Sequence, residues 1–295
     1  MGDGVMRWSE IREAIRRRPG MYIGGRPDGE GAARLLLSYL VEPALRLGAR
    51  RVELTVAPGP WFTLRHDGPR PRHEDLTGLD LGKGWGDLGV LTALTQVVRL
   101  DTTGEEASSL DGPSGHEMSG ELDPEIFTVD EVDAETLADR FRELAWLHPG
   151  ATLTLRSPAI EETWHQPGGL LDCVEALAEG MGPALTAPVV IDHRDEERGV
   201  AVQVAVRRGR RWPARILSFV GGQRTRGGGS HQDALRTALL DERDLLPDGL
   251  AAVITVEVDE PSYAGATKDR LDDEVVARVV AEACQRYLAS LASRS

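Results

Sequence analysis

The sequence places an imidazole and a carboxylate side by side. His66 ends the alternating stretch WFTLRH (61–66), and Asp67 follows it directly. Because histidine titrates near neutral pH and is the most frequent general acid or base, this pair predicts acid–base chemistry such as proton transfer. The alternative is a surface histidine at a strand end, which is the more common state of a lone histidine. His73, in the stretch PRHEDL, is predicted to be a loop residue.

Length and composition describe an ordinary acidic protein. The chain has 295 residues, 41% of them hydrophobic and 28% charged, which fits two domains or one large one. No apolar run is long enough to span a membrane, and the N-terminus lacks the apolar stretch of a signal peptide. Cys173 and Cys284 form neither a disulfide framework nor a metal-binding spacing. We therefore expect a cytoplasmic protein without a metal site.

The net charge of −14 argues against autonomous DNA binding. Nucleic-acid phosphates are bound by a face rich in Lys and Arg, and the release of their counterions drives that binding. The stretch RRGRR (207–211) is the local exception. We interpret it as a solvated turn between strands rather than as a nucleic-acid patch.

Hydrophobic periodicity predicts alternating helices and strands in the first part of the chain. Helices are expected over 8–18, 31–47, 87–99, 133–147 and 168–179, and strands over 51–58, 61–66 and 151–157. The segment 102–122, rich in Gly, Ser and Glu, is predicted to be mobile.

The pattern changes after a proline-containing link at 182–188. This link predicts a domain boundary that divides the chain into 1–182 and 183–295. The second part is expected to contain strands over 200–209, 214–222 and 250–261 and helices over 229–243 and 272–291. That order fits an α+β sandwich with helices on one face of a sheet.

Four motifs in this order resemble the DNA gyrase B and topoisomerase IV branch of the GHKL ATPases. RRPGMYIG (17–24) is similar to the N-terminal signature of that family, and FRELAWLHPGATLTLR (141–156) to the last helix and strand of its ATPase domain. FVGGQRTRGGGSHQDALR (219–236) is similar to the start of its transducer domain. LAAVITVEVDEPSYAGATKDRL (250–271) is similar to the strand and loop that carry its switch lysine, here Lys268.

The resemblance implies a Bergerat-type GHKL sandwich followed by a transducer domain of ribosomal S5 type, without the family's DNA-cleavage domain. It also explains the turn at Pro19-Gly20, which in the family joins the N-terminal arm to the ATP-binding domain and helps to form the dimer edge. Proline and glycine end the preceding helix, and Gly24-Gly25 permit the turn into the next one.

The residues that hydrolyse ATP in this family have no counterparts. The family needs a water-activating Glu and, four residues later on the same helix, an Asn that holds Mg²⁺. One register of the resemblance puts this pair on Ser38 and Glu42, and the other puts it on Leu35 and Tyr39. The chain contains no asparagine at all. Glu42 is the one side chain that could replace it, beside Pro43.

The nucleotide contacts differ as well. The family's adenine-binding Asp corresponds to His66, or to Asp67 after a shift of one residue. The family's phosphate loop is a glycine-rich helix N-terminus whose N–H groups cradle phosphates. It corresponds to GKGWGDLG (82–89), in which Trp85 and Asp87 intrude and the carboxylate opposes a polyphosphate.

Further nucleotide contacts of the family are altered in this chain. The family's long ATP lid is mostly missing, and His116 or one of its neighbours takes the place of a Thr that helps to hold adenine. Lys268 retains the switch position, although Ala266 replaces the neighbouring Gln. A solvated loop lysine is the alternative for Lys268. We therefore expect that the binding of ATP and Mg²⁺ has been lost.

The sequence leaves three functions open. In the first, the old pocket is repurposed to bind or convert a small organic molecule, with isomerisation or cyclisation as examples. In the second, the chain is a non-catalytic module, able to form a homodimer, that regulates gyrase or another partner. In the third, it is a residual ATP-dependent dimerisation clamp. For the first function, the catalytic candidates are His66, Asp67 and Glu42, and the ligand-binding candidates are Ser38, Tyr39, Trp85, Asp87, His116 and Lys268.

Overall fold

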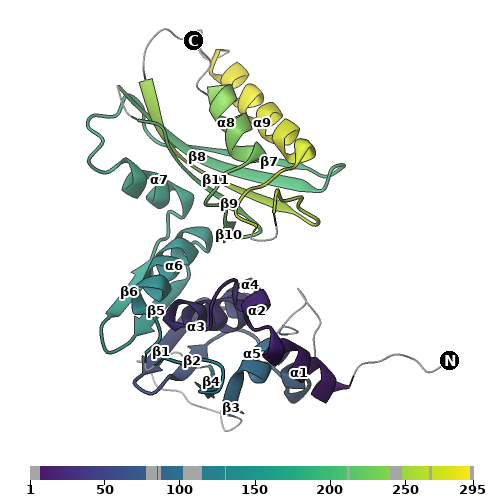
Figure 1. Cartoon of the computed structure of the whole chain (residues 1–295). Coiled ribbons are helices and arrows are strands. Elements are labelled where there is room, and N and C mark those ends of the chain that lie inside the picture. Colours follow the sequence, from purple (N-terminus) through teal and green to yellow (C-terminus); the bar gives the residue numbers. More distant parts are fainter. Residues whose placement is uncertain are drawn as a thin grey trace, which may run out of the picture. The chain divides into compact units, whose positions relative to one another are not determined.

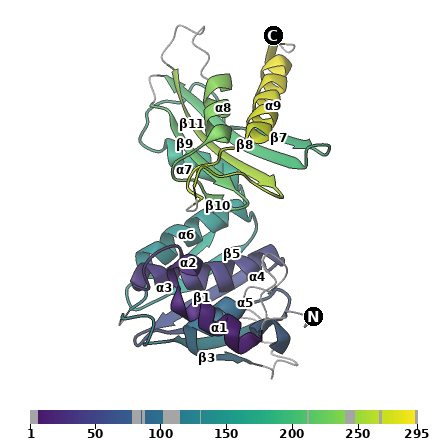
Figure 2. The same ribbon diagram turned by 45° about the vertical axis from the view of Figure 1, so that its right-hand side comes forward.

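The structure is a computed structural model of the chain and describes residues 7–77, 85, 88–101, 115–129, 131–210, 213–239, 248–265 and 268–292. Two compact units divide the chain, Met1–Pro167 and Gly168–Ser295. Each contains one sheet with helices packed on it (Figures 1 and 2), so the predicted α+β class is confirmed. Among the described residues, no helix is long and apolar enough to cross a membrane.

The first unit is built on a six-stranded sheet with the order β3-β4-β2-β1-β5-β6. Its helices are α1 (Trp8–Arg17), α2 (Gly20–Ile23), α3 (Gly29–Leu36), the π-helix η1 (Leu37–Val41), α4 (Glu42–Arg46), the 3₁₀-helix η2 (His73–Thr77), α5 (Leu88–Leu94) and α6 (Ala134–Leu147). Its strands are β1 (Arg51–Ala57), β2 (Trp61–His66), β3 (Thr95–Leu100), β4 (His116–Leu122), β5 (Thr152–Arg156) and β6 (Glu161–His165). Alternate residues of β1 and β2 are buried, so one face of the sheet carries the core.

The predicted helix over 31–47 exists but contains a wide turn. Glu42 N–H donates to the carbonyl of Leu37, five residues back, and the next residue is Pro43, which has no N–H. A proline inside a helix removes one i→i−4 bond, and a π-turn accommodates the loss. This turn sets the direction of Ser38 and Tyr39.

Two predictions around residue 95 are corrected. The helix predicted over 87–99 ends at Leu94, and β3 starts at the next residue because Thr95 Oγ1 donates to the carbonyl of Leu91 and the β-branched residues that follow pair with β4. The segment 102–122, predicted to be mobile, contains β4 from His116 onward, while 102–114 lie outside the described residues.

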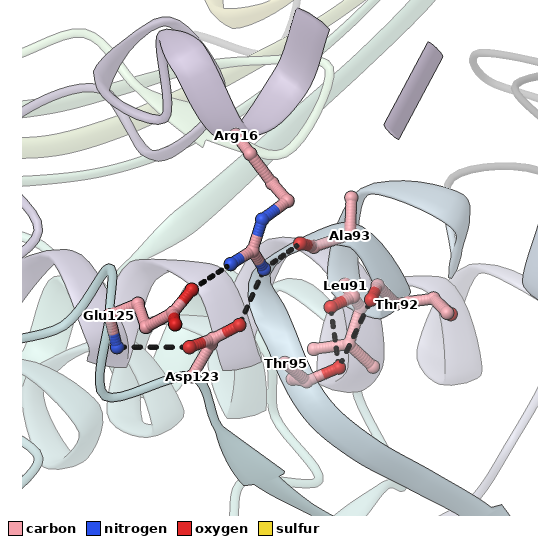
Figure 3. A network of polar contacts seen from close by, with 7 residues as sticks. All are labelled: Arg16, Leu91, Thr92, Ala93, Thr95, Asp123 and Glu125. Atoms are coloured by element: carbon pink, nitrogen blue, oxygen red, sulfur yellow. Dashed lines mark hydrogen bonds and ion pairs between the residues drawn. The ribbon is translucent and has the colours of Figure 1, made fainter. Parts of the chain in front are cut away.

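The Arg16 guanidinium links helix α1 to other segments of the first unit (Figure 3). Arg16 donates to the carbonyl of Ala93 at 3.1 Å, and pairs with Asp123 at 2.5 Å and with Glu125 at 3.1 Å. Asp123 is almost completely buried. The contact therefore joins the N-terminal helix to the end of α5 and to the residues after β4.

The second unit has a five-stranded sheet with the order β10-β9-β11-β8-β7. Its elements are α7 (Leu170–Ala178), β7 (Val189–Asp195), β8 (Val200–Arg210), β9 (Arg215–Val220), β10 (Gln223–Arg224), α8 (Ser230–Leu239), β11 (Asp248–Val258) and α9 (Glu274–Ala292). Helices α8 and α9 pack together over the sheet (Figure 2). Arg207 lies inside β8 and pairs with Glu175, so the interpretation of 207–211 as a turn was wrong for this part of the stretch.

Helix α7 determines where the two units separate. It packs against β8 and β11, and the compact units accordingly divide after Pro167. The sequence places the boundary later, at the proline-containing link before β7, because the periodicity of α7 gives no sign of which sheet it covers.

Candidate functional site

His66 lies at the inward end of β2 and is completely buried. The alternation of β2 turns Phe62, Leu64 and His66 to the same face of the sheet, and so carries the imidazole into the core. Its ring centroid is 5.2 Å from that of Trp85, at an interplanar angle of 41°, and 5.9 Å from that of His116 on β4, edge to face. The strand thus delivers an imidazole into a cluster of three rings.

Neither nitrogen of His66 has a hydrogen-bond partner among the described residues. Burial, and to a smaller extent the nearby His116, lower the pKa of His66 to about 4 against the opposing effect of Asp67. The ring is therefore neutral at pH 7. It presents one N–H donor and one lone pair, both unmet, in a place where unmet polar groups are rare.

A narrow gap lies beside this imidazole. Its lining consists of His66, Arg70, Pro71, Leu100, Asp101, His116, Glu117 and Met118. The gap is too narrow for a water molecule. Trp85 packs against the ring without lining the gap, and its indole N–H donates to the carbonyl of Pro69 at 3.0 Å.

Asp67 is engaged elsewhere. One carboxylate oxygen accepts from the backbone N–H groups of Arg50 and Arg51 at 2.7 and 2.8 Å, and the carboxylate lies 3.7 Å from the Arg51 guanidinium. It therefore fixes the start of β1 against the end of β2. Asp67 follows His66 in the sequence, but no hydrogen bond joins the two side chains. A catalytic role for the pair stays a prediction.

Tyr39 and Ser38, two of the helix positions that the resemblance suggested for ATP hydrolysis, have structural roles. Tyr39 donates its hydroxyl proton to the carbonyl of Tyr22 at 2.9 Å, which ties η1 to α2. Ser38 is half-buried in the same π-turn. These contacts explain how the signature segment around Tyr22 is held, and they supply no carboxylate that could activate water.

Glu42 forms a buried ion-pair cluster with α6. Arg140 approaches its carboxylate through Nε at 2.9 Å and Nη2 at 2.8 Å, and pairs through Nη1 with Glu143 at 3.0 Å. Burial lowers the pKa of Arg140, but the two carboxylates outweigh it and leave that pKa raised. Arg140 was missed by sequence reasoning because no local pattern links α6 to a residue 98 positions earlier.

Two further candidates are Lys268 and Asp87. Lys268 belongs to the second unit, has a φ of 56°, and holds its Nζ 5.9 Å from the centre of the Tyr263 ring. Asp87 and most of the glycine-rich stretch 82–89 lie outside the described residues. Among the residues that are described, no group of three His, Cys, Asp or Glu side chains could hold a metal ion.

Comparison with known proteins gives one consistent answer, although no protein-family model matches the chain. The DNA gyrase B protein of Staphylococcus aureus (strain Mu50 / ATCC 700699) is 27% identical over 349 residues, which cover 95% of this chain and 54% of that protein. The gyrase B protein of Staphylococcus epidermidis is 27% identical over 97% of this chain and 56% of its own length. The chain thus spans about half the length of the curated relatives it matches.

Solved structures agree with these sequences. The gyrase B structure from Myxococcus xanthus superposes with a TM-score of 0.77 at 26% identity, covering 95% of both chains. The 43K ATPase domain of Thermus thermophilus gyrase B, solved with an aminocoumarin, gives 0.74 at 23% identity over 96% of this chain and 90% of that one. The chain is therefore similar to DNA gyrase B along nearly its whole length and has the fold of the gyrase B ATPase domain.

Proposed function

We propose that this chain is a gyrase B-like protein that has lost ATP hydrolysis, and that its former nucleotide pocket binds a small non-nucleotide molecule. One observation carries the proposal. His66, at the position where the resemblance puts the adenine-binding Asp, is completely buried with both ring nitrogens unmet. A buried polar group left without a partner costs about 1–3 kcal/mol, so a bound molecule that meets it would be stabilised by the same contact.

The loss of hydrolysis is supported by the groups that surround the old catalytic helix. The sequence has no asparagine for Mg²⁺. Glu42, which could replace it, shares the guanidinium of Arg140 with Glu143. A carboxylate already neutralised by an internal cation is a poor ligand for Mg²⁺, because the metal would have to displace that cation.

Binding is favoured over conversion of the ligand. A group with a pKa of about 4 accepts a proton weakly at pH 7, and efficient general bases have a pKa near the working pH. Asp67 raises the pKa of His66 only in part, because burial outweighs it, and its carboxylate accepts hydrogen bonds from the backbone rather than from the imidazole. We therefore assign His66, Trp85 and His116 to binding.

A second function is favoured by one specific observation, the narrowness of the gap beside His66. A pocket filled by its own side chains is consistent with a non-catalytic interaction module, which acts through its surface. Such a module would work in the cytoplasm as a homodimer or on a partner such as gyrase. The two functions differ in whether His116 and Arg70 move aside for a ligand.

Magnesium and a non-hydrolysable ATP analogue are expected to leave the thermal unfolding midpoint unchanged at millimolar concentration, relative to magnesium alone. A ligand that binds only the folded state stabilises it by about 2.7 kcal/mol at one hundred times its dissociation constant, so even modest binding would be visible. A clear rise in the midpoint would overturn the proposed loss of nucleotide binding and would support a residual ATP-dependent clamp.

A further inference from the structure

The chemistry of the gap beside His66 restricts what it can hold, if the function proposed above is correct. The imidazole is neutral and offers one donor and one acceptor. A neutral ring cannot balance the charge of a buried anion or cation, and burying an unbalanced ion is far more costly than burying a polar neutral group. The first requirement is therefore that the ligand bears no net charge at this end.

The charged side chains around the gap do not change this conclusion. Arg70 contributes one positive charge and Asp101 one negative charge. Glu117 is paired with Arg65 at 2.8 Å. With Arg65 counted, although it lies outside the lining, the formal charges of these four side chains sum to zero, so the surroundings of the gap have no surplus with which to attract a phosphate, a carboxylate or an ammonium group.

The remaining walls are apolar and partly aromatic. His116 stands edge-on to the imidazole, and Pro71, Leu100 and Met118 are the apolar side chains of the lining. Since the gap is too narrow for water at present, a thin molecule requires the smallest displacement of His116 and Arg70 at its rim. Flat rings also pack well against tilted and edge-on aromatic neighbours.

We propose that the gap between His66 and His116 binds an uncharged, planar, single-ring molecule that exchanges a hydrogen bond with the His66 imidazole, as an aromatic amide does. The N–H of His66 donates to the carbonyl oxygen of such a ligand, or its lone pair accepts from the amide N–H. His116 supplies the aromatic wall of the gap, while Trp85 packs against the imidazole without lining the gap and keeps its own N–H on the carbonyl of Pro69.

Three probes of nearly equal shape test the charge requirement on the full-length chain. Benzamide is uncharged, benzoate is an anion and benzamidine is a cation. Titration calorimetry at pH 7 should show binding of benzamide, and weaker or no binding of the other two. With ¹⁵N-labelled histidine, benzamide should also shift the ring-nitrogen resonances of His66, which identifies the site directly.

The matched variants are His66→Phe, which keeps a flat ring but removes both nitrogens, and His73→Phe, which makes the same change at an exposed position of the same unit. His66→Phe should weaken benzamide binding about tenfold, which corresponds to about 1.4 kcal/mol, and His73→Phe should not change it. Equal binding by wild type and His66→Phe, unshifted His66 resonances at saturating benzamide, or tighter binding of a charged probe would each overturn the inference.

Failure of the underlying function gives a different result. Free adenine is also flat and uncharged but has two fused rings. If adenine and the magnesium–ATP analogue bind while benzamide does not, the nucleotide site survives and the function proposed above is wrong. If neither nucleotide nor benzamide binds, the loss of nucleotide binding stands and the ligand class inferred here is wrong.

Discussion

Replacing Arg140 with methionine is expected to lower the free energy of unfolding of the first unit by about 3–5 kcal/mol. The side chains of Arg140, Glu42 and Glu143 are only 11%, 13% and 11% exposed. Methionine fills a similar volume but leaves two buried carboxylates without their shared guanidinium. Urea denaturation, combined with hydrogen exchange of the α6 amides, measures the loss and assigns it to this unit.

Arg156 provides the matched control for this change. It also bridges two carboxylates, Glu53 and Glu161, but its side chain is 47% exposed. Exposed pairs contribute about 0–1 kcal/mol, so Arg156→Met should have a small effect. Combining Arg140→Met with Glu42→Gln and Glu143→Gln should restore most of the lost stability. Equal losses for Arg140→Met and Arg156→Met would show that burial of the cluster contributes nothing.

The sequence predicts most of the elements in the neighbourhood of the site, because their signals are local. The hairpin of β1 and β2 follows from the alternation of apolar and polar residues in two short stretches. Helix α6 begins after Asp133, whose side chain accepts from the N–H groups of Glu135 and Thr136. Such caps and alternations are written within a few residues and can be recognised without the fold.

The errors occur where a tertiary contact overrides a local pattern. Residues 95–99 continue the apolar spacing of α5, yet they pair with β4 as strand β3. These residues form a strand rather than a helix because Val97 and Val98 pair with β4 at the sheet edge, and because β-branched residues fit a pleated surface. The π-turn, in contrast, has a local signal in the sequence, because Pro43 lies inside a helical pattern.

The candidate site was predicted as a set of residue types but not as an arrangement. His66, Trp85 and His116 are brought together by three segments separated in the chain, and only the pairing of β2 with β4 puts His66 opposite His116. The adjacency of Asp67 to His66 suggested a catalytic pair, but neighbours along a strand point in opposite directions. The partner of Glu42 could not be found either, because Arg140 is reached only through the packing of α6 against the helices before it.

Lowering the pH from 6.5 to about 4 is expected to cost the first unit about 3 kcal/mol of stability through His66 alone. The unfolded chain takes up a proton near pH 6.5, while burial and the charge of His116 hold the pKa of the folded imidazole at about 4. Stability from this group is therefore complete above pH 6.5 and is lost as the pH falls toward 4, at about 1.36 kcal/mol for each pH unit.

His66→Phe should remove this part of the acid sensitivity, because phenylalanine has no proton to gain. The comparison needs hydrogen exchange at amides of β1 and β2, since His231 in the second unit is also buried, with a pKa lowered to about 4, and contributes its own loss there. His73→Phe, at an exposed site, should keep the wild-type dependence of the free energy of unfolding on pH.

If wild type and His66→Phe lose stability equally between pH 6.5 and 4, the imidazole is not held neutral by burial. Its unmet nitrogens then cannot be the feature that selects an uncharged ligand. A reduced slope in the variant would tie the acid response and the ligand chemistry to the same buried ring.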